Sequence, residues 1–290
     1  MSSDFFKLKG EFTRISTQDE LATHMDRSDH LKDVLYEPPL LAPDRPKNIM
    51  SNKTFVNVSF SKTTIRGVNF RRCDFQNCLF IGTVFDHCEF HGCTFVDCNP
   101  YKARFTKTYI NPAVFSKMLD PKSHSNIGII LFQQLLANSA ENRQSGFAQS
   151  AEYYFRKWKR YQLEYEYRKK QISRGYFYRR WIPDRLYDLF AGYGLRTTPF
   201  LVWTVLLFSL ILLVNHFLWP RFAMHGYSPG STRSNWIVTF YYTVITISTL
   251  GYGDITPSSN FGMALAGIEA LLGIVWLSIL ASIIIKKVVR

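Results

Sequence analysis

The chain has 290 residues, a net charge of +13 and five cysteines. Its length suggests about two domains, and its positive charge excludes an acidic mimic of DNA. The apolar residues gather in the C-terminal third, so a polar domain and a membrane-embedded domain are expected to follow one another.

Residues 1–50 show little periodicity. Pro38, Pro39, Pro43 and Pro46 favour an extended N-terminal lead-in over this segment. The opening Met-Ser-Ser-Asp-Phe-Phe-Lys is not a secretory signal, so the first membrane span is expected much later in the chain.

A period of five residues begins at Phe55 and continues to Ile110. Phe occupies nine of the twelve positions, and a small residue usually stands two positions earlier. Neither a helix nor a single strand has this period, so the pattern is a repeat. The positions are Phe55, Phe60, Ile65, Phe70, Phe75, Phe80, Phe85, Phe90, Phe95, Pro100, Phe105 and Ile110.

The repeat resembles the pentapeptide-repeat family. The resemblance implies a right-handed, quadrilateral β-helix over residues 51–110, with about three coils and with Phe and the small residues facing inward. Residues 51–110 carry eight basic and four acidic side chains, the opposite balance to the acidic surface with which some family members imitate DNA.

The five cysteines, Cys73, Cys78, Cys88, Cys93 and Cys98, all occupy the small-residue positions of the repeat. Their spacing follows from the period, and no Cys-x-x-Cys pair is present. We therefore expect free thiols that pack in the core, and we assign no metal site to them.

Residues 111–182 are predicted to form a helical connector, with Asn111 as a cap and Pro112 in the first turn. One aromatic face includes Phe147, Tyr154 and Trp158, with Arg160 turned away from it. The segment resembles the helix pair of pentapeptide-repeat proteins that are fused to ion-channel pores. Residues 183–198 are expected to begin with Pro183 in the first turn of a short interfacial helix, followed by a bend at Gly192-Tyr193-Gly194.

The pore domain is expected over residues 199–290. Two apolar stretches, about Pro199 to Trp219 and about Phe261 to Ile285, each exceed the roughly 18 residues that a membrane-spanning helix needs. Twelve basic residues against four acidic ones lie between Arg156 and Arg196, and Lys286, Lys287 and Arg290 follow the second stretch, whereas only Arg221 and Arg233 lie between the two. The positive-inside rule therefore places both termini in the cytoplasm. Charge beside a membrane favours anionic lipid headgroups over nucleic acid as its partner.

Residues 249–254 read Thr-Leu-Gly-Tyr-Gly-Asp and lie between the two stretches. A bare cation can cross a membrane where backbone carbonyls replace its water. Gly251 and Gly253 permit the positive φ that turns successive carbonyls to one side. The Thr249 hydroxyl adds an oxygen ligand, and the ring of Tyr252 is expected to point outward as a strut.

This motif resembles the selectivity filter of the potassium channel family, with Leu250 where Val is commonest. The resemblance implies K⁺ coordination by Thr249, Leu250, Gly251, Tyr252 and Gly253. A pore helix, capped by Ser234 or Asn235, is expected to run to about Thr246 and to favour a cation at its C-terminal end. Each chain supplies one carbonyl per level, so four copies are required and a homotetramer is expected.

Five residues are assigned to filter support: Tyr241, Tyr242, Thr246, Asp254 and Glu269. The hydroxyls of Tyr241 and Tyr242 are expected to bond to Tyr252 of the same or the next subunit. Glu269 is the one formally charged residue in either apolar stretch, and a carboxyl at that depth is a functional candidate. We expect it to bond to a pore-helix hydroxyl, of Thr246 or Ser248.

Gly273 aligns with the hinge glycine of the family, although a helix glycine is also commonly a packing contact. Four residues at helical spacing are expected to line the inner cavity and its gate: Ile274, Leu277, Ala281 and Ile285.

These features predict a multidomain membrane protein with a repeat β-helix, a helical connector and an all-α, two-span, tetrameric pore. The expected function is a potassium-selective channel of the cell (inner) membrane, gated or assembled through its cytoplasmic N-terminal domain. Two alternatives stay open, a weakly selective cation channel and a membrane-anchored scaffold whose repeats bind an unidentified partner. No catalytic residue is assigned, and no cofactor or metal is expected beyond permeant K⁺.

Overall fold

The computed structural model describes residues 3–42, 48–222, 224–225 and 235–288. The chain divides into two units, Met1–Asp184 and Arg185–Arg290. Several residues named above lie outside the described residues, namely Pro43, Pro46, Arg233, Ser234 and Arg290, as do the side chains of Lys286 and Lys287.

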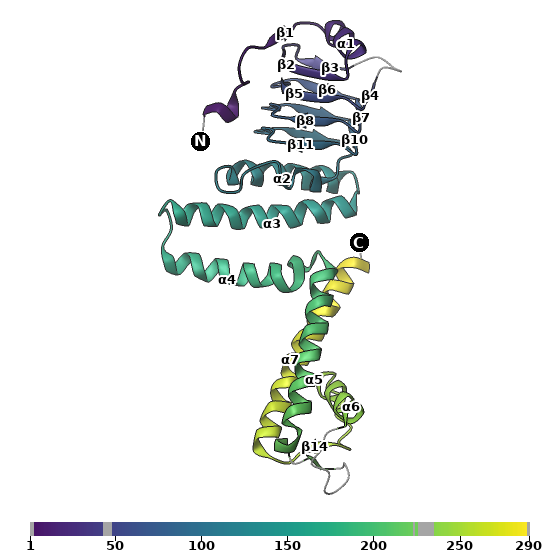
Figure 1. Cartoon of the computed structure of the whole chain (residues 1–290), viewed down its shortest axis with the longest axis vertical. Coiled ribbons are helices and arrows are strands. Elements are labelled where there is room, and N and C mark those ends of the chain that lie inside the picture. Colours follow the sequence, from purple (N-terminus) through teal and green to yellow (C-terminus); the bar gives the residue numbers. More distant parts are fainter. Residues whose placement is uncertain (1–2, 43–47, 223, 226–234, 289–290) are drawn as a thin grey trace. The chain divides into compact units, whose positions relative to one another are not determined.

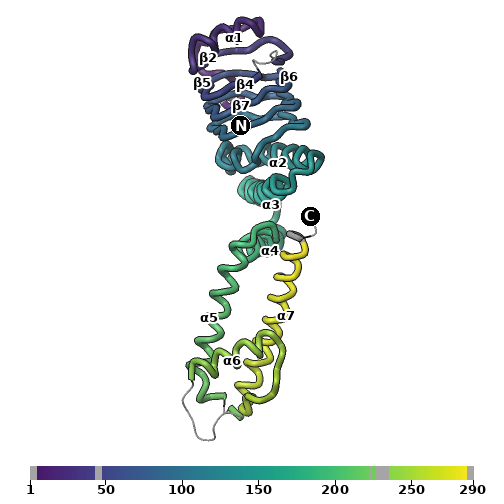
Figure 2. Tube along the Cα trace, turned by 90° about the vertical axis from the view of Figure 1, so that its right-hand side faces the viewer, coloured from purple at the N-terminus to yellow at the C-terminus, as the bar shows by residue number. Residues whose placement is uncertain are grey.

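The first unit is built around parallel sheets that stack as successive coils (Figures 1 and 2). Isolated bridges that join Ser59, Leu79 and Asn99 form a fourth side. The first sheet contains β1 (Thr13–Ile15), β2 (His30–Tyr36), β5 (Thr54–Ser59), β8 (Asp74–Gln76) and β11 (Thr94–Val96); the second contains β4 (Ile49–Ser51), β7 (Asn69–Arg71) and β10 (Glu89–His91); the third contains β3 (Leu40–Leu41), β6 (Thr64–Arg66), β9 (Val84–Asp86) and β12 (Arg104–Thr106).

The register confirms the expected pentapeptide β-helix. Phe55 pairs with Phe75, and Phe75 pairs with Phe95, so one coil takes twenty residues. Their rings stack at 4.8 Å between centroids, which matches the roughly 4.8 Å spacing of neighbouring strands. The period of five therefore stacks Phe75 on Phe55 and Phe95 on Phe75, and these rings belong to the buried core.

Residues 1–50 differ from the expected extended lead-in, because strands β2, β3 and β4 already belong to the stack. Leu31 pairs with Phe55, and Leu41 pairs with Ile65. These partners are 24 residues apart instead of 20, and aliphatic side chains replace Phe at the inward positions. The period of five does not extend into this coil, and so the sequence pattern missed it.

All five cysteines are free and buried, as the repeat predicts. Each Sγ lies near a backbone carbonyl of the preceding coil; Cys88 Sγ, for example, is 3.2 Å from Ile65 O. Burial raises the pKa of the Cys88 thiol to about 11, so it remains protonated at neutral pH. Thr83 occupies the same kind of position and donates to Phe60 O at 2.7 Å, so this ladder accepts either side chain.

Helices close the two ends of the β-helix. Leu21 and Met25 of α1 (Gln18–Arg27) and Leu131 and Phe132 of α2 (Ser125–Glu141) belong to the same buried core as the Phe ladder. At the α2 end, the Asn138 amide accepts a hydrogen bond from Thr108 N at 3.0 Å and donates one to Thr108 O at 2.7 Å. Backbone groups left open by the last coil are thereby satisfied.

Short 3₁₀ segments precede these helices, η1 (Ser3–Phe6) and η2 (Pro112–Phe115). The Asn111 side chain caps η2 by accepting from Ala113 N at 3.0 Å, as predicted. Two long helices follow α2, namely α3 (Ser145–Arg168) and α4 (Arg174–Ala191).

Trp158 of α3 is buried against α2, as the aromatic pattern predicts. Two other expectations for this region are wrong. Arg160 is buried and bonds to Asp184 at 3.2 Å, instead of turning away. Pro183 lies inside α4 and not in its first turn, because the helix already begins at Arg174.

The second unit contains a bend, two long helices and a shorter helix. The bend, η3 (Gly192–Gly194), has Tyr193 at φ 59°, which agrees with a structural role for this copy of Gly-Tyr-Gly. The helices are α5 (Thr197–Phe222), α6 (Trp236–Ile247) and α7 (Asn260–Val288), and a small ribbon pairs β13 (Met224–His225) with β14 (Thr256–Pro257). By length and composition, α5 and residues 260–285 of α7 could each cross a membrane.

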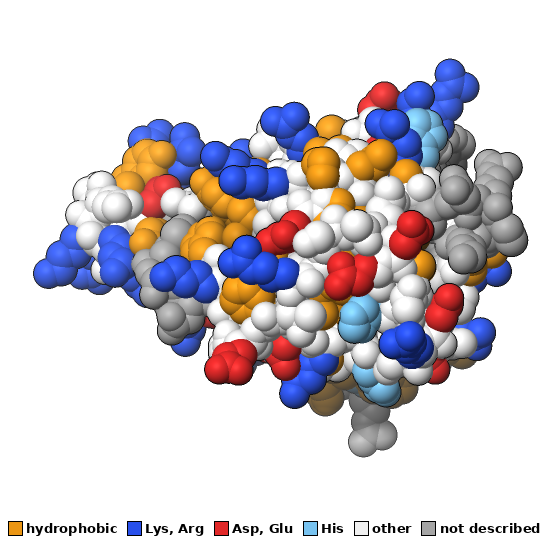
Figure 3. All heavy atoms as spheres, turned by 90° about the horizontal axis from the view of Figure 1, so that it is seen from above, with side chains coloured by type: hydrophobic (Ala, Val, Ile, Leu, Met, Phe, Trp, Pro, Cys, Tyr) orange, Lys and Arg blue, Asp and Glu red, His pale blue; other side chains and the backbone are white. Residues whose placement is uncertain are grey.

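Charged side chains of both signs are interspersed on the face of the molecule shown in Figure 3. No acidic surface dominates that face, in keeping with the excess of basic residues in the repeats.

Gly128 provides a test of how tightly α2 and α3 pack. A Cβ at this position would lie 2.2 Å from the Trp158 ring. Gly128→Ala should therefore destabilise the protein by roughly 1–3 kcal/mol through overpacking, lowering Tm by roughly 2–4 °C per kcal/mol. Thermal unfolding of the full chain, followed by circular dichroism, measures this.

Gly146→Ala is the matched control, because a Cβ there meets no atom within 4 Å. It should leave Tm unchanged or slightly raised, since Ala is the better helix former. Equal Tm values for Gly128→Ala and wild type would show that α2 and α3 are not packed as described.

Candidate functional site

The six-residue motif at 249–254 follows directly on the C-terminal end of α6. Asn235 caps the start of this helix by accepting from Ile237 N at 2.9 Å, as expected. At the other end, Ser248 N still bonds to Val244 O, and Thr249 N bonds to Thr246 O at 3.1 Å. Helical hydrogen bonding ends there, and the chain continues as an irregular segment.

Alternate residues of this segment have left-handed backbone angles. The φ values are 59° at Thr249, 51° at Gly251 and 77° at Gly253. Glycine adopts such angles without steric cost, whereas a β-branched residue such as Thr does so rarely. The segment therefore has the backbone alternation for which the two glycines are required.

The side chains that alternate with the two glycines, those of Leu250 and Tyr252, turn outward within the single chain. Leu250 is 60% exposed and Tyr252 is 69% exposed. A large apolar side chain and an aromatic ring are thus left uncovered at the same place.

Tyr241 supports the segment through a partner that differs from the expected one. Its hydroxyl donates to Asp254 Oδ2 at 2.6 Å, not to Tyr252 of the same chain. Asp254 also accepts from Ile255 N at 3.0 Å. The last residue of the six-residue motif, Asp254, is therefore bonded to the middle of α6. The C-terminal end of the same helix leads into the first residue of the motif.

Tyr242, the next residue of α6, is buried. Its ring packs edge-on against Trp219 of α5, with 5.9 Å between ring centroids, and lies near Phe222. Within one chain, Tyr242 holds α6 to α5 instead of contacting Tyr252. Ile245 of α6 is buried as well.

Glu269 is buried, as expected, but the bonding partner predicted for it is wrong. Only 3% of the residue is exposed. Its carboxylate accepts from Asn215 Nδ2 of α5 at 3.1 Å, not from Thr246 or Ser248. Ser248 and Thr246 lie at the C-terminal end of α6, where the Ser248 hydroxyl bonds to Ile245 O at 3.4 Å.

Asn215 connects all three helices of the unit. The same Nδ2 donates to Thr243 Oγ1 of α6 at 3.0 Å, and that hydroxyl donates to Thr239 O. Asn215, Thr243 and Thr239 are fully buried. The polar group of Glu269 is thus satisfied inside an otherwise apolar bundle, and α5, α6 and α7 are joined behind the motif.

Gly273 lies where α7 meets the end of α6. A Cβ at this position would be 1.9 Å from the carbonyl oxygen of Ile247. The glycine therefore permits a close helix contact immediately before the 249–254 segment. The helix α7 is continuous through this point, and the hinge role of Gly273 stays a prediction.

The residues predicted to line a cavity are uncovered in the single chain. Ile274, Leu277, Ala281 and Ile285 are all exposed, and they follow one another along α7. A single chain does not enclose a space between them, so their role depends on neighbouring copies.

Asn215 and Thr243 were not identified from the sequence. An uncharged amide inside the apolar stretch from Pro199 to Trp219 was an available signal, because a polar group there needs a partner. The pairing itself required the three-dimensional arrangement, since Asn215 and Glu269 are far apart in the chain.

The Asn215–Glu269 pair makes a prediction that a thermodynamic cycle can check. Glu269→Leu should leave one N–H of the Asn215 amide without an acceptor, while the other still bonds to Thr243. Such a buried, unsatisfied donor costs about 1–3 kcal/mol. Glu269→Gln retains an acceptor oxygen and should cost less. The double variant Asn215→Leu/Glu269→Leu should be more stable than the sum of the single losses predicts. Thermal unfolding of detergent-extracted protein measures the four stabilities, and additive losses would contradict the contact.

Comparison with known proteins assigns both parts of the chain. Residues 200–290 match the ion channel family model, and residues 49–77 and 65–99 match pentapeptide repeats, with eight copies.

Curated relatives include "Two-pore potassium channel 4" of Arabidopsis thaliana, 30% identical over 92 residues, which are 30% of this chain and 31% of the relative. "Potassium voltage-gated channel protein shk-1" of Caenorhabditis elegans is 33% identical over 66 residues, covering 23% and 12%. "A-type voltage-gated potassium channel KCND3" of Homo sapiens is 31% identical over 85 residues, covering 29% and 13%.

The matched regions thus span 31% of the length of the first of these relatives and smaller shares of the others. The chain combines pentapeptide repeats between residues 49 and 99 with an ion channel domain over residues 200–290, and the proteins to which it is similar are potassium channels.

Proposed function

We propose that this protein is a potassium-selective channel. The observation that carries the proposal is the positive φ at Thr249, Gly251 and Gly253. Alternating backbone angles turn successive carbonyl groups toward one side, where they can replace the water around a K⁺ ion. The Thr249 hydroxyl supplies a further oxygen at the inner end of the filter.

Four copies are needed for this chemistry, because one chain provides one carbonyl at each level. The exposure of Leu250 and Tyr252 is in keeping with a surface that neighbouring copies cover. The uncovered residues Ile274, Leu277, Ala281 and Ile285 would then line the inner cavity of a homotetramer. Its apolar wall suits a gate that closes by excluding water.

The electrostatics of α6 favour a cation at the same place. This helix ends at Ile247, directly before the filter, and the C-terminal end of a helix carries partial negative charge. The hydrogen bond from Tyr241 to Asp254 and the contact of Gly273 with Ile247 O would hold the filter in position.

The protein would lie in the cell membrane as a two-span protein with both termini in the cytoplasm. The apolar helices α5 and α7 are long enough to cross, and basic residues are concentrated before α5. These residues would contact anionic lipid headgroups. The N-terminal β-helix unit would then be cytoplasmic, where it gates or assembles the pore.

Gly251→Ala tests the filter. A methyl group at φ 51° finds open space in the chain, so its effect is conformational, roughly 1–2 kcal/mol per residue against the left-handed angle. With four copies in one filter, the variant should lose K⁺ flux or its preference for K⁺ over Na⁺. Flux of each ion into liposomes that contain the purified protein measures this.

Gly267→Ala is the matched control, because this glycine lies in α7 without positive φ and a Cβ there meets no atom within 4 Å. It should conduct as the wild type does. Wild-type selectivity in Gly251→Ala would remove the filter assignment. Equal flux of both ions through the wild type would favour a weakly selective cation channel, and no flux at all would favour a scaffold.

A further inference from the structure

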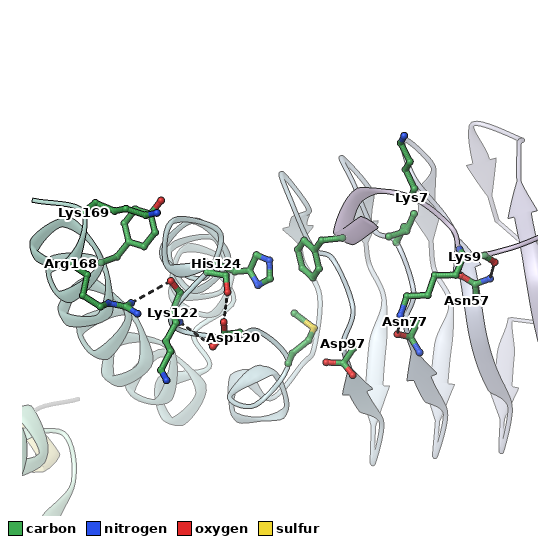
Figure 4. Close-up of a pocket in the computed structure, with 15 residues that line it drawn as sticks. Lys7, Lys9, Asn57, Asn77, Asp97, Asp120, Lys122, His124, Arg168 and Lys169 are labelled. Atoms are coloured by element: carbon green, nitrogen blue, oxygen red, sulfur yellow. Dashed lines mark hydrogen bonds between the residues drawn. The ribbon is translucent and has the colours of Figure 1, made fainter. Parts of the chain in front are cut away.

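A cavity of about 720 Å³ in the first unit has no role in the proposed pore (Figure 4). Three parts of the chain line it: the N-terminal segment at residues 5–9, the outer surface of the β-helix, and the loop before α2 together with the end of α3. Its volume falls within the roughly 300–1,000 Å³ typical of small-molecule sites. The walls come from elements that pack within one unit, so the cavity exists in a single chain.

Positive charge dominates the lining. The lining contains two carboxylates, Asp97 and Asp120, and five basic side chains, those of Lys7, Lys9, Lys122, Arg168 and Lys169. Asp120 is already engaged, because it accepts from Lys122 N at 3.1 Å and from the Ser123 hydroxyl. The Ser123 bond lowers the pKa of Asp120, with burial acting against it.

The five cations are not neutralised by acidic partners. Lys9 Nζ bonds to the Asn77 amide at 3.1 Å, and Arg168 Nη2 bonds to Lys122 O at 3.3 Å. Among the residues that the structure describes, none of the five forms an ion pair with a carboxylate. Like charges collected around one cavity repel, and an anion bound between them would relieve this repulsion.

Two further features of the lining leave hydrogen-bonding groups without a partner. His124 stacks on Phe5 with 3.9 Å between ring centroids, and its buried Nδ1 has no hydrogen-bond partner among the described residues. The helix α2 begins at Ser125, and His124 makes no side-chain cap. The positive end of this 17-residue helix therefore lies beside the cavity, with backbone N–H groups that no cap satisfies.

We propose that this cavity binds a small anion with two or more phosphate groups. The phosphates would lie among Lys122, Arg168 and Lys169 near the start of α2. Phe5, His124 and Tyr165 provide flat rings on which an attached base could stack. Arg and Lys together suit phosphate. The guanidinium of Arg offers two parallel N–H donors, and the ammonium group of Lys carries a compact positive charge.

The proposal concerns binding to the N-terminal unit and does not depend on whether the pore conducts. Its probes are ATP, inorganic triphosphate and adenosine, titrated into the full chain in detergent by isothermal titration calorimetry. ATP and triphosphate should both bind, and adenosine should not, because it lacks the charge. Affinity should fall as salt is raised, since the contacts are ionic. No binding of either phosphate compound, or equal binding of adenosine and ATP, would overturn the proposal.

Lys122→Gln/Lys169→Gln tests the position of the site. Removing two charge-assisted contacts should weaken ATP binding by roughly 10–100-fold or more. The matched control, Lys117→Gln/Lys159→Gln, removes the same charge from two exposed lysines that do not line the cavity, one in the loop before α2 and one on α3. This control variant should bind ATP with an affinity within about twofold of the wild-type value, a much smaller change than tenfold. If both double variants weakened ATP binding equally, the effect would come from the net charge of the protein alone. That result would contradict a site in this cavity.

Discussion

Backbone carbonyl groups usually need a hydrogen-bond donor, and an ion filter works only where several of them are held without one. In the filter proposed at residues 249–254, the surrounding side chains would provide that restraint. Tyr241 bonds to Asp254 at one end of the segment, while α7 packs against Ile247 O at the other through Gly273. Behind both, Asn215 joins α5 to α6 and α7 through Thr243 and Glu269. In the proposed filter, the buried polar groups of the bundle would hold the backbone of residues 249–254 in position.

In the β-helix, by contrast, backbone groups are paired, because each coil forms hydrogen bonds with the backbone of the next coil. Stacked Phe rings fill its interior at the same spacing as the strands, so the period of the sequence and the repeat of the hydrogen bonds agree. The stack must end somewhere, and there the Asn138 amide occupies both backbone groups of Thr108. This leaves α2 and α3 as a layer on the last coil, and the basic cavity lies beside that layer.

The features that repeat in the sequence were predicted well. The Phe ladder, the buried cysteines and the two long apolar helices follow from periodicity and length alone. Features that depend on contacts between distant residues were not. Nothing local links Asn215 to Glu269. Strands β2 and β3 were missed because their partners are 24 residues apart and their inward side chains, Leu31 and Leu41, are aliphatic. Pro183 suggested a helix start, yet the helix begins at Arg174. The alignment with a hinge glycine gave only one reason for a glycine at position 273. The structure adds a second reason, because a Cβ at this position would collide with Ile247 O whether or not the helix bends.

The most direct test of the proposed filter is the reversal potential of the purified wild-type protein in a planar bilayer. With K⁺ tenfold higher on one side and Na⁺ tenfold higher on the other, a K⁺-selective pore should reverse close to the K⁺ equilibrium value, about 59 mV from zero. Currents that reverse near zero would contradict K⁺ selectivity in this filter.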